Sequence, residues 1–340
     1  YELTCRDWRS DVCSSDLSLS KPDRLRSGMG TEITIIFRSS ACSWAGSDSG
    51  GCTMCGYWND RALSISSEDF WAQFQFSIEK FHDILDNVQS KIVFKMFTSG
   101  SFCDSKEIPM EIQLRILEKL SQFSSIQEII VESRPQYITA ALLVEYQKVL
   151  KGKYLEIAIG LESANDIVRN SIINKGFTWE HFLKAKDLLH QHGFGIKAYL
   201  LLKPPFMNEY SAIIDTYESI RVCIKQGVDT ISINPTNIQI NTLCDELAKD
   251  NAFRPPWLFS VLWIIKHAVS ADQLKKTRIV CDPSAAGKER GVHNCDPADE
   301  SNEKCLDILK RFVETQDLST IPHLQFASCW QDYVFETLLK

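Results

Sequence analysis

The stretch ITIIFRSSACSWAGSDSGGCTMC, residues 33–55, joins an apolar run to three closely spaced cysteines. Residues 33–37 favour a strand, and the glycine- and serine-rich segment after them contains Cys42, Cys52 and Cys55. Three thiolates on one loop can hold an iron–sulfur cluster and leave one iron open for a small molecule. A zinc knuckle, or three reduced cysteines packed as small hydrophobic residues, is compatible with the same spacing.

Short apolar runs alternate with longer amphipathic runs from Thr31 onward, which is typical of strand–helix units and a parallel sheet. Strands are expected at residues 32–37, 91–97, 128–131, 155–159, 195–202 and 230–233. Helices are expected at residues 67–87, 109–122, 136–150, 179–192 and 209–226. These units predict an α/β fold, a partial (β/α)6 barrel of the TIM type, whose reactive groups come from the loops after the strands.

The chain is expected to divide into three parts. Residues 1–28 include CRDWRSDVCSSDL (residues 5–17), which resembles translated adapter sequence. This part is therefore expected to be non-native or disordered, with native sequence beginning between Ser18 and Met29, and Cys5 and Cys13 are given no ligand role. Residues 29–235 would form the barrel, and residues 236–340 a C-terminal α+β extension rich in Cys and His.

The composition limits the compartment and the partners. With 340 residues, 44% of them hydrophobic, the chain can bury a large core. Twelve cysteines without a leader-like apolar segment favour a reducing compartment and metal ligation, so we expect the cytoplasm. The apolar stretch 257–269 is too short to span a bilayer and contains Lys266, so no membrane anchor is expected.

A formal net charge of −7 disfavours a general nucleic-acid coat protein but permits one RNA to bind a local basic patch. The candidate residues flank the Cys/His segment and are Lys275, Lys276, Arg278, Lys288 and Arg290. A solvated surface is the other interpretation of these five residues.

The cysteine loop and the alternating units resemble the radical S-adenosylmethionine (SAM) superfamily. Its members hold a [4Fe-4S] cluster on three cysteines after the first strand of a partial barrel. The usual spacing there is CxxxCxxC, so the nine-residue first gap between Cys42 and Cys52 is a departure, and it indicates a subgroup related to the Elongator catalytic subunit. The resemblance implies SAM at the open iron and its cleavage to a 5′-deoxyadenosyl radical. No catalytic residue beyond the cluster ligands is predicted.

Four loop motifs are the candidates for binding SAM. TSGSF at 98–102 takes the place of the superfamily's GGE motif, and VESRP at 131–135 resembles the Elongator-related pattern. GLE at 160–162 resembles an element beneath SAM, and KPP at 203–205 could line the adenine site. The resemblance implies SAM contacts from Thr98, Ser99, Gly100, Ser101, Glu132, Arg134, Glu162, Arg169 and Lys203, with Arg169 on the SAM carboxylate. Ordinary turns and surface ion pairs are the alternatives.

Three motifs in the last third of the chain sharpen the resemblance: NPTNIQ at 234–239, FRPPWLFSVLW at 253–263 and CDPSAAGKERGVHNC at 281–295. They resemble the radical SAM enzymes of archaeosine formation. This implies a lyase that acts on tRNA carrying a lysine adduct of 7-cyano-7-deazaguanine in the D-loop and cleaves the lysine carbon–nitrogen bond to leave archaeosine. The implied partners are tRNA, a lysine-transferring archaeosine synthase subunit and an electron donor.

Two other functions remain open. One is a different radical SAM tRNA-modifying enzyme related to the Elongator subunit, and the other is a non-catalytic iron–sulfur or zinc protein that binds RNA. The C-terminal segment is also a candidate zinc site, with Cys281, His293, Cys295 and either Cys329 or Cys305 as tetrahedral ligands. Unligated cysteines are the alternative there. Cys103, Cys223 and Cys244 are expected to be buried reduced thiols.

Overall fold

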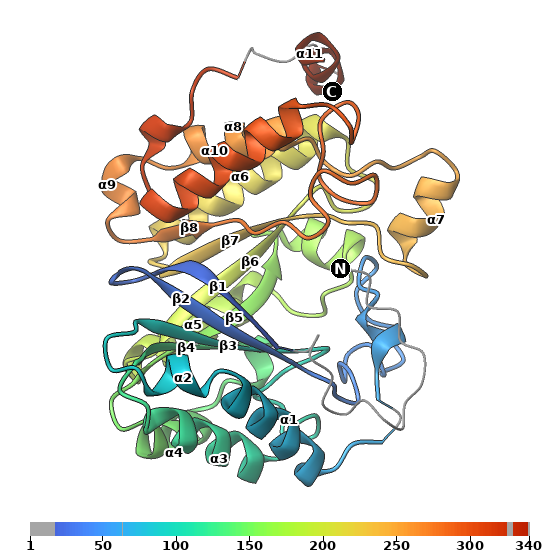
Figure 1. Cartoon of the computed structure of the whole chain (residues 1–340). Helices are drawn as coiled ribbons and strands as arrows, with labels where there is room; N and C mark the ends of the chain where they lie inside the picture. Colours follow the sequence, from blue (N-terminus) through green and yellow to red (C-terminus); the bar gives the residue numbers. More distant parts are fainter. Residues whose placement is uncertain (1–17, 63, 325–328, 339–340) are drawn as a thin grey trace. The chain divides into compact units, whose positions relative to one another are not determined.

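The fold is that of a computed structural model, which describes residues 18–62, 64–324 and 329–338. Eight strands follow one another in sequence order (Figure 1). They are β1 (Ser18–Leu25), β2 (Gly28–Phe37), β3 (Ile92–Thr98), β4 (Ile126–Ser133), β5 (Tyr154–Glu162), β6 (Gly195–Leu202), β7 (Thr230–Pro235) and β8 (Arg278–Val280). The six predicted strands correspond to β2 to β7, so the predicted partial barrel of the α/β class is confirmed.

The helices that follow the strands also match the predicted pattern. The first unit of the alternation contains two helices, where one long helix was expected, because the helix breaks at Phe81. The helices are α1 (Ser67–Lys80), α2 (His82–Asp86), α3 (Met110–Ser121), α4 (Ala140–Leu150), α5 (Trp179–Gln191), α6 (Glu209–Lys225), α7 (Leu243–Lys249), α8 (Leu258–Ala268), α9 (Ala271–Leu274), α10 (Ser301–Thr315) and α11 (Trp330–Leu338). None of these is long and apolar enough to cross a membrane, a statement limited to the part of the chain that the structure describes.

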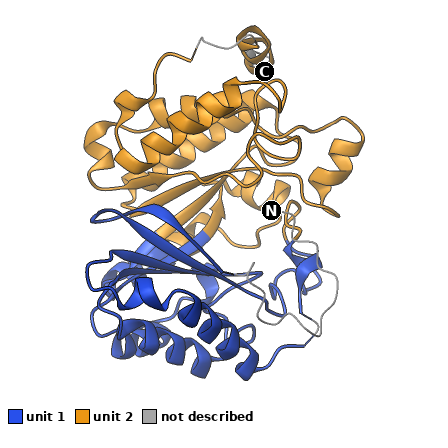
Figure 2. Ribbon diagram, in the orientation of Figure 1, with its two compact units in different colours: residues 1–51, 57–159, 184–196 blue, residues 52–56, 160–183, 197–340 orange. Residues whose placement is uncertain are grey.

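The chain forms two compact units, which Figure 2 shows in different colours. Unit 1 comprises residues 1–51, 57–159 and 184–196, and unit 2 comprises residues 52–56, 160–183 and 197–340. In unit 1, β2 to β5 pair in parallel, and the rings of Phe37 and Phe70 lie 5.9 Å apart, which packs α1 against the sheet. In unit 2, β6, β7 and β8 pair in parallel, and α6 packs against α8 through Tyr217 and Trp263, whose rings lie 6.2 Å apart.

The predicted boundary at 235/236 does not coincide with a boundary between the compact units. The C-terminal elements belong to the same unit as β6 and β7, because β8 pairs with β7 from Thr230↔Arg278 to Ser232↔Val280 and α8 lies along α6 (Figure 1). Elements of the predicted extension 236–340 thus pack in the same compact unit as β6 and β7, and the division at 235/236 stays a prediction.

The prediction that residues 1–28 are non-native or disordered is wrong for residues 18–28. β1 pairs with β2 in an antiparallel ladder from Ser18↔Ile35 to Leu25↔Gly28, and Leu25 is fully buried. The strand was missed because Lys21, Pro22 and Asp23 interrupt any apolar alternation, although an edge strand accepts such residues. Residues 1–17, with Cys5 and Cys13, lie outside the described residues.

Candidate active site

The loop after β2 is folded by short-range hydrogen bonds. The N–H of Gly46 donates to the Cys42 carbonyl at 3.1 Å, and the N–H of Gly50 donates to the Ser47 carbonyl at 3.0 Å. Gly50 and Gly51 have φ of +73° and +82°, a conformation that favours glycine. Cys42 is half-buried and forms no disulfide within the described residues.

A network around Ser43 fixes the residue next to Cys42. The Ser43 N–H donates to Glu107 Oε1 at 2.7 Å, and its hydroxyl lies 2.6 Å from the same oxygen and also contacts Asp104 Oδ2. The hydroxyl of Tyr137 lies 3.2 Å from Ser43 Oγ. A serine hydroxyl carries one proton, so it can serve only one of the two carboxylates at a time. Burial raises the pKa of the Glu107 carboxyl, with Asp104 adding to the effect.

The TSGSF loop lies against Cys42 through Gly100. A Cβ at Gly100 would sit 3.0 Å from Cys42 Cα and would collide with the Glu107 carboxylate, so only glycine fits. The Gly100 N–H donates to Thr98 Oγ1 at 2.8 Å, and the Ser101 N–H donates to Glu107 Oε2. Glu107 therefore ties the cysteine loop to the loop after β3.

The VESRP motif places a cationic group beside an aromatic ring of the cysteine loop. Arg134 is buried, and its guanidinium lies 5.0 Å from the centre of the Trp44 ring, two residues after Cys42. Glu132 is half-buried at the end of β4, and its carbonyl accepts from the Phe102 N–H at 2.8 Å. Ser99 is half-buried beside Gly100. The predicted residues from two loops are thus brought to the Cys42 side of unit 1.

The second and third cysteines lie in the short segment 52–56 of unit 2. The N–H and hydroxyl of Thr53 donate to the carbonyls of Ile173 and Ile172 at 3.0 and 2.9 Å. The Gly56 N–H donates to Gln239 Oε1 at 2.6 Å. Cys52 and Cys55 are half-buried. The segment is therefore held from two sides, by the loop after β5 and by the NPTNIQ motif after β7.

Glu162 ends β5 in a strained conformation with φ of +65°. Its Oε1 accepts from Lys175 Nζ at 2.7 Å, and both side chains are largely buried. A Cβ on Gly160 would come within 2.6 Å of Glu162 Oε1 and 2.5 Å of Lys175 Nζ, so the GLE glycine leaves room for this ion pair. The sequence analysis did not identify Lys175.

Arg169 has no exposed surface and binds the loop that contains it. Its Nη1 donates to the Ser163 carbonyl at 2.6 Å, its Nε donates to the Phe177 carbonyl at 2.9 Å, and its guanidinium also meets Asp166. Burial lowers the pKa of Arg169 to about 10. These contacts favour a structural role for Arg169, and direct contact with the SAM carboxylate stays a prediction.

Lys203 follows β6 with φ of +64° and takes part in a buried ion pair. Its Nζ lies 2.8 Å from Oε2 of Glu209, which has no exposed surface, and 3.5 Å from Oε1 of Glu336 on α11. Glu209 Oε1 accepts from the Trp257 N–H at 3.0 Å, and Glu336 Oε2 accepts from Trp257 Nε1 at 2.7 Å. Lys203 is thus neutralised within the chain, and its contact with SAM stays a prediction.

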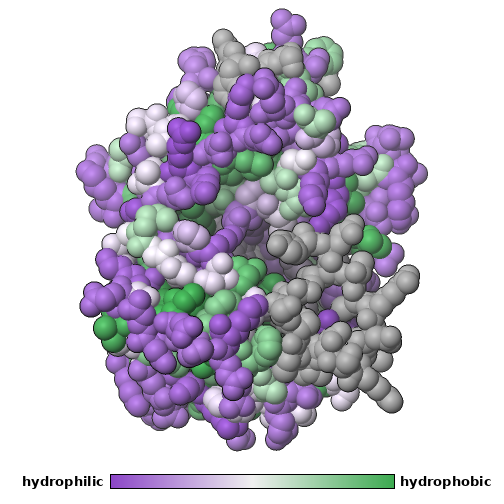
Figure 3. Space-filling model, viewed as in Figure 1, coloured by the Kyte–Doolittle hydropathy of each residue, from purple (hydrophilic) through white to green (hydrophobic). Residues whose placement is uncertain are grey.

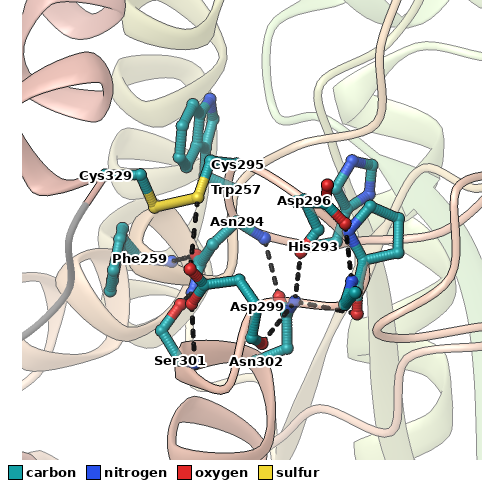
Figure 4. Close-up of a disulfide and its surroundings, with 12 residues drawn as sticks. Trp257, Phe259, His293, Asn294, Cys295, Asp296, Asp299, Ser301, Asn302 and Cys329 are labelled. Carbon is teal, nitrogen blue, oxygen red and sulfur yellow. Dashed lines mark hydrogen bonds between the residues drawn. A yellow bond between two sulfur atoms is a disulfide. The ribbon is translucent and has the colours of Figure 1, made fainter.

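The C-terminal cysteines are arranged differently from the predicted zinc site. Cys295 and Cys329 form a disulfide, and Asp299 Oδ2 lies 3.7 Å from Cys295 Sγ (Figure 4). Within the described residues, Cys295, Asp299 and Cys329 are the one group spaced for a metal ion, so Cys281 and His293 are not gathered there. His293 Nδ1 instead lies 2.7 Å from the Gly291 carbonyl. In the part of the chain that the structure describes, two of the four predicted ligands are joined by a disulfide, and zinc binding by this segment stays a prediction.

Each cysteine of the motif, taken in its own unit, is compatible with the group that the motifs imply. Cys42 of unit 1 and Cys52 and Cys55 of unit 2 are all half-buried, so none is packed away inside a core. Ser101 Oγ is buried and has no hydrogen-bond partner among the described residues, so it can accept from an ammonium or donate to a carboxylate. The signal missed in the sequence is Glu107, which stands five residues after Phe102 and connects the two loops.

Comparisons with known proteins agree with this arrangement. The sequence profile of the radical SAM superfamily matches residues 49–220. The archaeosine synthase subunit beta of Methanosarcina acetivorans is 38% identical over 85% of this chain and 81% of that protein. The subunit of the same name from Thermococcus kodakarensis is 34% identical over 89% of this chain and 91% of that protein.

A solved structure supports the fold alone. The Elp3 protein of Methanocaldococcus infernus, with an N-terminal deletion, aligns with a TM-score of 0.50 and 17% identity over 71% of this chain and 59% of that chain. Because the profile spans half of the chain and the two relatives cover most of it, the chain belongs to the radical SAM superfamily, in the family of the archaeosine synthase beta subunits.

Proposed function

We propose that this chain is the radical SAM subunit of an archaeosine synthase. It would cleave the carbon–nitrogen bond of a lysine adduct of 7-cyano-7-deazaguanine in the tRNA D-loop and leave archaeosine. The names of the two relatives support the pathway, and one observation supports the chemistry. Gly100 of the TSGSF loop packs against the backbone of Cys42, so a cluster ligand and a candidate SAM-binding loop are neighbours in one unit.

Cys42, Cys52 and Cys55 would hold a [4Fe-4S] cluster, and the cluster supplies reductive cleavage of SAM when it is bound. Thr98, Ser99, Gly100 and Ser101 would bind the amino acid part of SAM, because Ser101 offers a buried hydroxyl there. Arg134 would meet the carboxylate or the adenine from its position over Trp44. Glu107 holds the loop and does not move a proton to substrate in this proposal.

The reaction needs partners that the proposal includes. These are tRNA as substrate, a lysine-transferring subunit that makes the adduct, and an electron donor that reduces the cluster. A cytoplasmic location belongs to the proposal as well, because a cluster on Cys42, Cys52 and Cys55 needs a compartment that keeps these cysteines reduced.

The test is anaerobic reconstitution with iron and sulfide, followed by incubation with dithionite, SAM and tRNA that carries the lysine adduct. We expect 5′-deoxyadenosine together with a lysine-derived product and archaeosine in the tRNA. If the amount of 5′-deoxyadenosine is the same with and without this tRNA, the proposed substrate is wrong, and another radical SAM tRNA-modifying enzyme is favoured. If the protein binds zinc and cleaves no SAM, the proposal that it is an enzyme is wrong, and an RNA-binding protein is favoured.

A further inference from the structure

A hollow of about 550 Å3 lies on unit 2, between α6 and the loop after β5. Its walls are mostly apolar or aromatic and include Val168, Trp179, Met207, Tyr210 and Ile214. None of its lining residues belongs to the motifs assigned above to the cluster or to SAM. The hollow is therefore a second feature of this unit that the proposed chemistry does not use.

Exposed apolar side chains gather at this hollow. Tyr210 and Ile214 on α6 are 37% and 40% exposed. Ile167 and Phe206, 70% and 68% exposed, directly precede the lining residues Val168 and Met207 in the chain. The face drawn in Figure 3 is mostly hydrophilic. The exposed fractions of Ile167, Phe206, Tyr210 and Ile214 place four large apolar side chains in solvent within two loops and one helix, which indicates a surface that another molecule covers.

The hollow also carries negative charge. Asp215 Oδ1 accepts from Ser163 Oγ at 2.8 Å, while its Oδ2 is buried and has no hydrogen-bond partner among the described residues. Burial raises the pKa of Asp215 to about 6, against the opposing effects of Ser163 and Arg169, so the carboxyl is mostly ionised at pH 7.5. Glu218, one turn further along α6, is exposed and lies 3.3 Å from Arg221.

Aromatic walls beside carboxylates are the surroundings that a lysine or arginine side chain prefers. A cation gains from the faces of Trp179 and Tyr210, and its charge can be neutralised by Asp215 and Glu218. A nucleic acid is disfavoured, because its phosphates would meet the two carboxylates. The complementary ligand is thus a protein segment with one basic side chain between apolar ones.

We propose that this hollow is the docking site for a second protein subunit, which inserts a lysine or arginine side chain between Trp179 and Tyr210. The apolar residues that flank this lysine or arginine in the partner would pack on Ile214 and Phe206. The inference rests on the proposed function for the identity of that subunit, the lysine-transferring subunit of the same organism. It adds the surface and the chemistry by which the two subunits recognise each other.

The experiment measures the Kd between the purified lysine-transferring subunit and the reconstituted full chain, by isothermal titration calorimetry. Two exposed positions of the hollow are changed separately, Glu218→Lys and Ile214→Ser. Each is expected to weaken binding by about tenfold or more, since one creates repulsion and the other removes apolar contact. The matched control is Glu118→Lys, a charge reversal at an exposed position in the last turn of α3, expected to change Kd by less than about twofold.

The outcomes separate the inference from the function on which it rests. Equal affinity for wild type, both hollow variants and the control would overturn the docking site, and so would a homodimer of the chain that Glu218→Lys dissociates. A failure of the proposed function looks different: SAM cleavage in wild type would not respond to adduct-bearing tRNA. SAM cleavage by each variant without the partner is expected at the wild-type rate, which also shows that the variants fold.

Discussion

The cysteines of the loop after β2 and those of the C-terminal segment lie in opposite environments. Cys42, Cys52 and Cys55 are half-buried. In the C-terminal segment, burial raises the pKa of Cys305 to about 11, and Cys295 is bonded to Cys329. A metal or cluster binds the thiolate and not the thiol, so only the first set can be ligated without a change of structure. Accessibility, and not the number of cysteines, therefore distinguishes a ligand set from a packed set.

The surroundings explain this contrast. Gly50 and Gly51 give the first loop its turns at positive φ, and Glu107 holds the loop by accepting from the Ser43 N–H, so its thiols need not pack in a core. Cys305 lies inside α10 with no exposed surface, where Asn294 Nδ2 lies 3.6 Å from its sulfur. The loop after β2 thus leaves its cysteines partly exposed, whereas α10 buries Cys305 completely.

The largest expected effect comes from Cys55→Ala. We expect 5′-deoxyadenosine production to fall by about 1,000-fold or more, since the open iron needs all three thiolates, and a factor of that size is about 4 kcal/mol in activation free energy. Iron and sulfide content should fall with it, while circular dichroism remains that of the wild type. Deoxyadenosine is measured by chromatography after anaerobic incubation with SAM.

The matched control is Cys244→Ala, because Cys244 has no exposed surface and burial raises the pKa of its thiol to about 12. This variant should keep the cluster and lose about 1 kcal/mol of unfolding free energy for the small cavity. Loss of the cluster in Cys244→Ala, or its retention in Cys55→Ala, would contradict the assignment of the half-buried loop cysteines, and not the buried ones, as cluster ligands.

A second test removes the disulfide of the C-terminal segment. The double substitution Cys295→Ser with Cys329→Ser opens a link across a sequence separation of 34 residues and should cost about 3–4 kcal/mol of unfolding free energy, if loop entropy dominates. Urea unfolding of wild type with and without a thiol reductant should show the same difference. Two thiols that react quickly in the untreated native protein, with one zinc ion bound, would show instead that the segment is a metal site.

Much of the fold follows from the sequence, because continuous apolar runs identify β2 to β7 without tertiary information. The edge strand β1 could not be found in this way, since its polar residues acquire a strand conformation only through pairing with β2. In the site, the three cysteines and the TSGSF loop are visible as motifs. The Ser43–Glu107 contact is not, because it joins residues 64 positions apart that meet only when β2 and β3 are neighbours.

The roles of single charges were the hardest to predict. Arg169 and Lys203 stand where SAM ligands are expected, yet both are bound by groups of unit 2. Arg169 pairs with the nearby Asp166, whereas the partners of Lys203, Glu209 and Glu336, come from elements that no local pattern reveals. The partner of Cys295 was also not predictable, since four candidate ligands permitted several pairings. The sequence therefore predicts where the functional motifs lie better than it predicts which groups pair with their charged residues.

A third test addresses the support of the first loop. Glu107→Ala removes the acceptor of the Ser43 and Ser101 N–H groups, and buried donors left unpaired cost about 1–3 kcal/mol each. We expect unfolding free energy to fall by about 2 kcal/mol and the iron content after gel filtration to fall with it. The control is Glu111→Ala, an exposed carboxylate in the first turn of α3, which should retain its iron. Full iron content in Glu107→Ala would mean that the cysteine loop is held without this carboxylate.

The smallest expected effect concerns whether the C-terminal segment contacts RNA. Of the predicted patch, Arg278 lies in β8 with its Nε 3.3 Å from Thr230 Oγ1, so it is better regarded as part of the sheet, whereas Lys275 and Lys276 are exposed.

Lys275→Gln with Lys276→Gln should weaken tRNA binding a few-fold and lower the slope of log K against log salt by about 2, one for each lost phosphate contact. Lys304→Gln with Lys310→Gln removes the same charge from exposed positions of α10 and matches the ion pairing, since Lys275 pairs with Asp272 at 2.7 Å and Lys304 with Glu300 at 2.9 Å. An equal change of slope in both pairs would indicate net charge alone, so only a difference between them places RNA beside β8.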